Sequence, residues 1–107
     1  MTTERLKELG FEPVVDAGER QVSGGFCGDL LSWAMGRCGE GQVWFTVMGN
    51  VNAVAVASLA DAAAIVLCDG AALMADAEAR ARGQGVNVYR TALPEFEAAA
   101  AFAKVLA

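Results

Sequence analysis

The sequence predicts a single α/β domain in which helices cover a mainly parallel sheet. Its 107 residues suit one domain with one hydrophobic core. Three short apolar segments, rich in β-branched and aromatic residues, are typical of buried strands: residues 43–48, 64–68 and 86–90. Helix-like segments separate them, as the crossover between parallel strands requires. The chain from residue 43 onward is therefore expected to be β-α-β-α-β-α, a layered α/β/α architecture.

The N-terminal region is expected to begin with a short helix over residues 4–9. Gly10 suits the position just after that helix. An edge strand or an extended arm follows at residues 11–15, because Pro13 cannot donate a backbone hydrogen bond to a neighbouring strand. A turn at residues 16–19 then leads toward the glycine-rich part of the chain.

A glycine-rich loop and a helix are expected next. The loop Gly24-Gly25-Phe26-Cys27-Gly28 precedes Asp29, a favoured N-cap residue type. The apolar residues that follow share one face of a helix that ends near Gly36. Trp33 on this helix and Trp44 in the first central strand are expected in the core or in an interface.

The segment 53–61 has two interpretations. Some of its apolar residues alternate as in a strand, whereas others share one helical face. We choose helix, because a clear strand follows at once and a parallel pair needs a crossover. Asn50 or Asn52 can cap this helix. Further helices are expected over residues 71–82 and from about Pro94.

Composition and charge exclude several classes of function. The net charge is −5, and no basic patch with interleaved aromatic residues exists, which argues against nucleic-acid binding. Asp61 and Asp69 interrupt the longest apolar run, so that no run reaches transmembrane length. The first ten residues are polar and amphipathic and lack a secretory signal's apolar segment. We expect a soluble, cytoplasmic protein that binds neither nucleic acid nor membranes.

Catalytic and metal chemistry lack their usual residues. The chain has no histidine, which removes Ser-His-Asp and Cys-His catalysis. Cys27, Cys38 and Cys68 have no paired spacing, so neither a metal site nor a cofactor is expected. Cys68 is expected to be a packed thiol. Cys27 lies beside a helix start, and for this residue a lowered pKa with a role in sensing redox state is the alternative to a structural role. Glu95 and Glu97 are expected to be solvated, and no carboxylate pair stands out for acid–base work.

The apolar content points to an oligomer. Apolar residues make up 55% of the chain, and much of this excess is alanine. In so small a chain such an excess favours burial between subunits, and we expect a homodimer or a larger oligomer. The alternative is that alanine lets helices pack closely within one subunit.

The candidate binding site is the edge where the parallel strands end. Ligands of open parallel sheets bind beyond the carboxyl ends of the strands. The glycine loop would also bring a helix start there, whose free backbone N–H groups favour anions. The candidate ligand-binding residues are Gly24, Gly25, Asp29, Thr46, Met48, Asn50 and Asn52.

Most of these residues also have a structural interpretation. Gly24 and Gly25 can supply a positive φ or close packing in a turn, since the loop matches neither the Walker A nor the GxGxxG pattern. Asp29 can be a helix N-cap, and Asn50 and Asn52 can be cap and turn residues.

Residues 22–70 carry a pattern of V-x-GG-x-x-x-DLLSW-x-MG followed by W-x-T-x-M-x-N-x-N-x-VAVA-x-L. With the later segment VNVYRTALPEFE, this pattern resembles the small stand-alone proteins of the DRTGG-domain family. The letters Asp-Arg-Thr-Gly-Gly do not occur, and residues 20–25 are the nearest stretch. The resemblance implies one domain over residues 1–107, with a fold similar to the N-terminal domain of HPr kinase.

The resemblance also implies a regulatory role. Family members occur beside CBS domains and within phosphotransacetylases, where they are not the catalytic part, and stand-alone relatives are often encoded near hydrogenase and redox-regulatory genes of anaerobic bacteria. We therefore expect a non-catalytic regulatory or ligand-binding domain that recognises an anionic or nucleotide-like metabolite. The alternatives are a structural or partner-binding subunit of a redox assembly, with the alanine-rich helices as its interface, and an uncharacterised enzyme.

Overall fold

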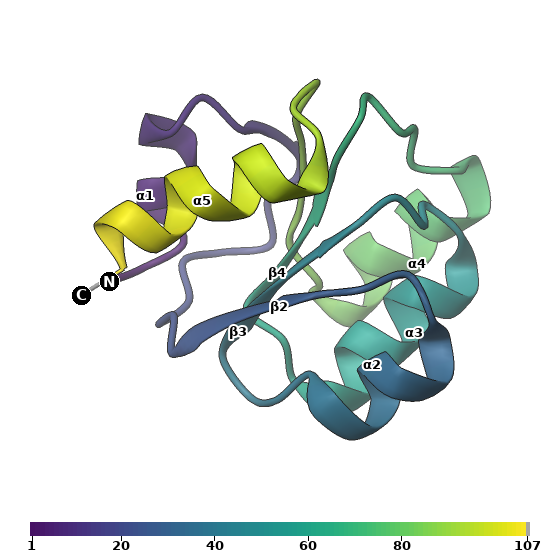
Figure 1. Ribbon diagram of the computed structural model, residues 1–107. Coiled ribbons are helices and arrows are strands. Elements are labelled where there is room, and N and C mark those ends of the chain that lie inside the picture. Colours follow the sequence, from purple (N-terminus) through teal and green to yellow (C-terminus); the bar gives the residue numbers. More distant parts are fainter. Residues whose placement is uncertain (107) are drawn as a thin grey trace.

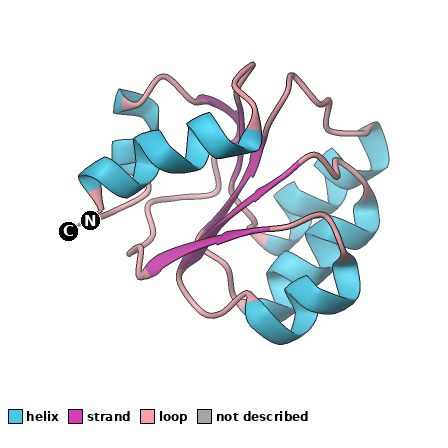
Figure 2. Cartoon of the chain, viewed as in Figure 1, coloured by secondary structure: helices cyan, strands magenta, loops and turns pink. Residues whose placement is uncertain are grey.

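A five-stranded sheet lies between two layers of helices in the computed structural model, which describes residues 1–106 (Figures 1 and 2). The strand order is β1-β5-β4-β3-β2; β1 runs antiparallel to β5, and all other neighbours are parallel. The strands are β1 (Glu12–Val15), β2 (Gly24–Cys27), β3 (Gln42–Thr46), β4 (Ala64–Leu67) and β5 (Val88–Arg90). This mostly parallel sheet confirms the predicted α/β fold class.

The helices divide unequally between the two faces. They are α1 (Glu4–Glu8), α2 (Leu31–Arg37), α3 (Val51–Ala60), α4 (Ala75–Gln84) and α5 (Glu95–Val105). From β2 to β5 each crossover moves to the next strand in the same direction, so right-handed connections place α2, α3 and α4 on one face. Helix α5 returns across the opposite face, where it packs against β2 and β3 near α1 (Figure 1).

The central strands are buried on both faces, as their apolar sequences predicted. Every residue of β4 is buried, and so is all of β3 after Gln42. Alternate side chains supply two cores: Trp44 and Leu67 pack toward α2, α3 and α4, whereas Phe45 and Val66 pack toward α1 and α5. The strands that position the carboxyl edge of the sheet are therefore fixed from both sides.

Several predicted elements are confirmed. The ambiguous segment is a helix, α3, and the Asn50 side chain caps it by accepting a hydrogen bond from Ala53 N at 2.9 Å. Strand β1 lies at a sheet edge, as Pro13 indicated. Helix α4 begins four residues later than predicted, at Ala75, because residues 71–74 form a loop that packs against Gly49.

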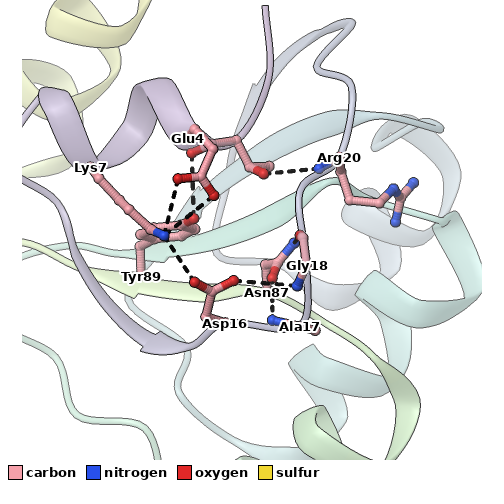
Figure 3. A network of polar contacts seen from close by, with 9 residues as sticks. Glu4, Lys7, Asp16, Ala17, Gly18, Arg20, Asn87 and Tyr89 are labelled. Carbon is pink, nitrogen blue, oxygen red and sulfur yellow. Dashed lines mark hydrogen bonds and ion pairs between the residues drawn. The ribbon is translucent and has the colours of Figure 1, made fainter.

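The N-terminal segment is held to the sheet by a polar network (Figure 3). Lys7 Nζ donates to Asp16 Oδ2 at 2.9 Å and also to the Glu4 carboxylate. Buried Asn87, just before β5, accepts from Ala17 N at 2.6 Å and donates to Gly18 O at 2.9 Å. These contacts lie at the amino edge of the parallel strands, opposite the candidate site.

Candidate functional site

Loops joined by hydrogen bonds form the carboxyl edge of the sheet. Because β2 to β5 are parallel, the segments that follow them all emerge on this side. Met74 N donates to Gly49 O at 2.9 Å, which joins the loops after β3 and β4. Asp69 N donates to Leu93 O at 2.8 Å, which joins the loops after β4 and β5. The edge is thus one connected surface.

Asp29 lies at one end of this edge, just after the edge strand β2. Its Oδ1 accepts a hydrogen bond from the Thr46 hydroxyl at 2.7 Å and another from Val47 N at 2.9 Å. The prediction that Asp29 caps α2 is wrong: Leu30 occupies the N-cap position, and no side chain caps the helix. The reason is that the end of β3 offers Asp29 two donors at once.

Glu95, the first residue of α5, completes a pair of carboxyl groups with Asp29. Burial, the hydrogen bond and negative charge of Asp29, and the charge of Asp69 raise the pKa of Glu95 to about 7. Burial opposes ionisation of Asp29, but hydrogen bonds from Glu95, Val47 and Thr46 outweigh it and lower the pKa of Asp29. Below about pH 7 the two carboxyl groups therefore hold one proton between them, carried mainly by Glu95.

Sequence reasoning missed Glu95. It was expected to be a solvated helix-face residue, yet it is half-buried and faces a second carboxyl group. One signal was available: an acidic residue in the first turn of the helix that follows the last parallel strand must lie at the carboxyl edge. The pairing with Asp29 also required knowledge that α5 crosses to the face beside β2.

The two glycines do not form the predicted loop. Gly24 and Gly25 are strand residues of β2, paired with Gln42 and Val43 of β3, and neither has a positive φ. They lie at the amino end of β2, away from the carboxyl edge. A Cβ atom on Gly25 would come within 2.9 Å of Phe102, so this glycine permits close packing of α5 on the sheet. A glycine cradle for an anion is therefore not formed.

The remaining predicted site residues meet at the carboxyl edge. Buried Thr46 contacts Asp29 directly, and its Oγ1 also accepts from Met48 N at 3.2 Å. Asn50 is there as well, with its side-chain oxygen used in capping α3. Asn52 is exposed in the first turn of α3. Thr46 is thus the only one of these four that is bonded to Asp29.

The cysteines near the edge are weakly acidic. Burial, followed by the charges of Glu95 and Asp29, raises the pKa of the exposed Cys27 thiol at the end of β2. The alternative of a lowered pKa at Cys27 is therefore wrong. Cys68 is fully buried, and burial raises its pKa to about 12, which confirms it as a packed thiol. Neither thiol has the low pKa of a reactive cysteine.

A small concavity opens at the other end of the carboxyl edge, near β1 and β5. It has a volume of about 190 Å³ and is lined by Glu12, Gly70, Arg90, Thr91 and Ala92. Arg90 donates from Nη2 to Gly70 O at 3.2 Å, while its Nε is buried without a hydrogen-bond partner. Within residues 1–106 no group of three or more Cys, Asp or Glu side chains is arranged to hold a metal ion.

Comparisons with known proteins identify no family for this chain, so the fold is what the structure establishes. No protein-family model matches the chain, and no curated protein matches it. It is a small α/β domain with a mostly parallel five-stranded sheet. None of the helices described in residues 1–106 is long and apolar enough to cross a membrane.

Proposed function

We propose that the chain is a DRTGG-like regulatory domain that binds a ligand at the carboxyl edge of its sheet and performs no catalysis. The resemblance of residues 22–70 to that family supports the regulatory role and its link to anaerobic redox or hydrogenase systems. The layered, mostly parallel α/β fold agrees with the architecture that the resemblance implies.

The coupled carboxyl groups of Asp29, which Thr46 and Val47 hold at the carboxyl edge, and of Glu95 carry the proposal. Two carboxyl groups held together on an exposed edge cost electrostatic free energy, since both cannot ionise freely. Perturbed groups of this kind are enriched at functional sites. A ligand that donates hydrogen bonds or carries a positive charge would relieve this repulsion. Thr46 holds Asp29 in place for that contact.

The chemistry of the pair changes the expected ligand. The anionic metabolite predicted from the sequence depended on a glycine loop that the fold does not contain. Asp29, Asp69 and Glu95 together would repel a bare anion. Amines, guanidines and amides fit the pair, and the amino group of a nucleotide base is the part of a nucleotide that would fit it.

A thermal-shift screen tests this proposal with two compound classes. One class contains nucleotides and phosphorylated metabolites, and the other contains amines, guanidines and amides. We expect a compound that raises the melting temperature of the wild type but not of Asp29→Asn or Glu95→Gln. The control is Glu97→Gln, which changes an exposed carboxylate on the same helix and should respond as the wild type does.

If no compound in either class shifts the melting temperature, the proposal of ligand binding is wrong. Turnover of a compound that is lost in Asp29→Asn would contradict the non-catalytic role.

A partner-binding subunit is the second candidate. The observation that favours it is the number of large apolar side chains left exposed, among them Trp33 and Phe96. We also propose, from the apolar composition, that the chain forms a homodimer. Sedimentation velocity over a range of concentrations tests the dimer: a single monomeric species at every concentration would contradict it.

A further inference from the structure

Exposed apolar side chains are concentrated at one edge of the molecule. Among residues 1–106, eight large apolar residues are exposed, and six of them lie in loops or first helical turns at the carboxyl edge. We call these six the carboxyl-edge patch: Leu30, Trp33, Val47, Met74, Leu93 and Phe96. The other two are Met35, one turn along α2, and Leu59, near the far end of α3. Such concentration is uncommon on the free surface of a monomer.

Backbone and side-chain hydrogen bonds connect the patch to the carboxyl pair. Val47 N donates to Asp29 itself, and Leu30 follows Asp29 in the chain. Trp33 N donates to Leu30 O at 3.1 Å, which fixes the first turn of α2. The remaining patch residues lie in the loops joined to this one or directly after Glu95. The apolar side chains therefore share one edge of the molecule with the two carboxyl groups.

We infer that the carboxyl-edge patch is a docking surface for a protein segment that presents an arginine or lysine flanked by apolar side chains. The basic group would bond to the carboxyl pair, and the apolar neighbours would cover residues such as Trp33, 56% exposed, and Phe96, 80% exposed. Burial of such aromatic side chains is a major source of interface free energy. This inference rests on the proposed binding role of the same edge and names the partner's chemistry.

Charge complementarity favours this occupant over a second copy of the chain. A two-fold contact through this patch would bring the Asp29–Glu95 pair of one copy against that of the other, and like charges across an interface are costly. Asp69 adds negative charge to the same edge, and the whole chain has a net charge of −5. The net charge would attract a basic segment at long range, and Asp29 would attract it at the edge. Arg37, which stacks on the Trp33 ring at 4.2 Å from its centroid, would have to leave that ring before an apolar neighbour could cover it.

Selection from a displayed library of short random peptides tests the inference. The wild-type protein is the target, and Asp29→Asn/Trp33→Ala is the counter-target. We expect enriched peptides to carry arginine or lysine beside apolar residues and to bind more weakly as salt rises. In fluorescence anisotropy with an enriched peptide, Asp29→Asn, Trp33→Ala and Phe96→Ala should each weaken binding about tenfold or more. Leu59→Ser changes an exposed apolar residue away from the edge, so it should leave binding unchanged.

The outcomes separate this inference from the proposed function. Enrichment of acidic or purely apolar peptides, or of none, would overturn the docking surface. A dimer that Trp33→Ala dissociates would overturn it too, because a second copy would then be the occupant. A small molecule whose thermal shift is lost in Asp29→Asn would support the proposed function even if no peptide is enriched. Peptide binding without any small-molecule response would support the docking surface alone. Circular dichroism verifies that each variant is folded.

Discussion

Asp29 and Glu95 shift the pKa of each other's carboxyl group, although one follows the edge strand β2 and the other begins the last helix. The coupling joins two parts of the chain that are distant in sequence. Thr46 and Val47 orient Asp29 from the neighbouring strand, so that the pair is supported by three separate elements.

The stability of the fold should decrease as pH rises from about 4.5 to 7. The pKa of Glu95 is raised from 4.5 to about 7, so in this window the folded state binds more protons than the unfolded state. The free energy of unfolding should fall by about 1–2 kcal/mol, a value reduced for solvent access to the pair. Glu95→Gln should remove this slope, whereas Glu97→Gln should keep it. Urea unfolding between pH 5 and pH 8 measures the effect. Equal slopes in the wild type and Glu95→Gln would show that the pair does not share a proton.

Gly25→Ala and Gly24→Ala should differ in stability although the glycines are neighbours in β2. A Cβ atom on Gly25 would press on the Phe102 ring, which itself packs against Phe45 at a centroid distance of 5.3 Å. Overpacking of this kind costs about 1–3 kcal/mol. On Gly24 the nearest atom, Gln42 Nε2, would be 3.7 Å away, an ordinary contact. Chemical denaturation of both variants provides the comparison. Equal stabilities would mean that α5 does not pack on β2 as described.

Much of the fold could be predicted because its signals are local. The strands β3 and β4 are continuous apolar segments, and their burial on both faces follows directly. The choice of helix for α3 needed only the rule that parallel strands require a crossover. The Asn50 cap also depends on residues close in sequence, which is why it could be expected before the fold was known.

The site could be predicted only in part because its key contacts are long-range. Thr46 and Asp29 were expected at one edge. No local sequence pattern indicates, however, that Asp29 accepts hydrogen bonds from the end of β3 instead of capping α2. The partnership with Glu95 depends on α5 returning over the face beside β2. The predicted glycine loop failed for a related reason. Gly25 serves tertiary packing against Phe102, which no residue nearby in the sequence indicates.

Asn50→Ala should destabilise the domain, whereas Asn52→Ala should be nearly neutral. The Asn50 side chain accepts from Ala53 N at 2.9 Å and satisfies one of the free N–H groups at the start of α3. Loss of such a cap costs about 1 kcal/mol. Asn52 is exposed in the same helical turn, and alanine favours a helix. Thermal unfolding of the two variants measures the difference. Equal losses at the two positions would contradict the assigned cap.

Gly49→Ala should be the most disruptive single change at the carboxyl edge. A Cβ atom there would collide with the backbone carbonyl of Ala72, in the loop whose Met74 N–H bonds to Gly49 O. Backbone cannot rotate away as a side chain can, so the loop before α4 must move and that hydrogen bond is lost. We expect the free energy of unfolding to fall by about 2–4 kcal/mol.

Gly36→Ala is the matched control. Its Cβ atom would meet nothing within 4 Å, so this substitution in α2 should stabilise the helix by about 0.5–1 kcal/mol. Hydrogen exchange at Met74 provides a local measurement: its protection should fall in Gly49→Ala and persist in Gly36→Ala. If Met74 stays protected in Gly49→Ala, the loops after β3 and β4 are not joined at this point.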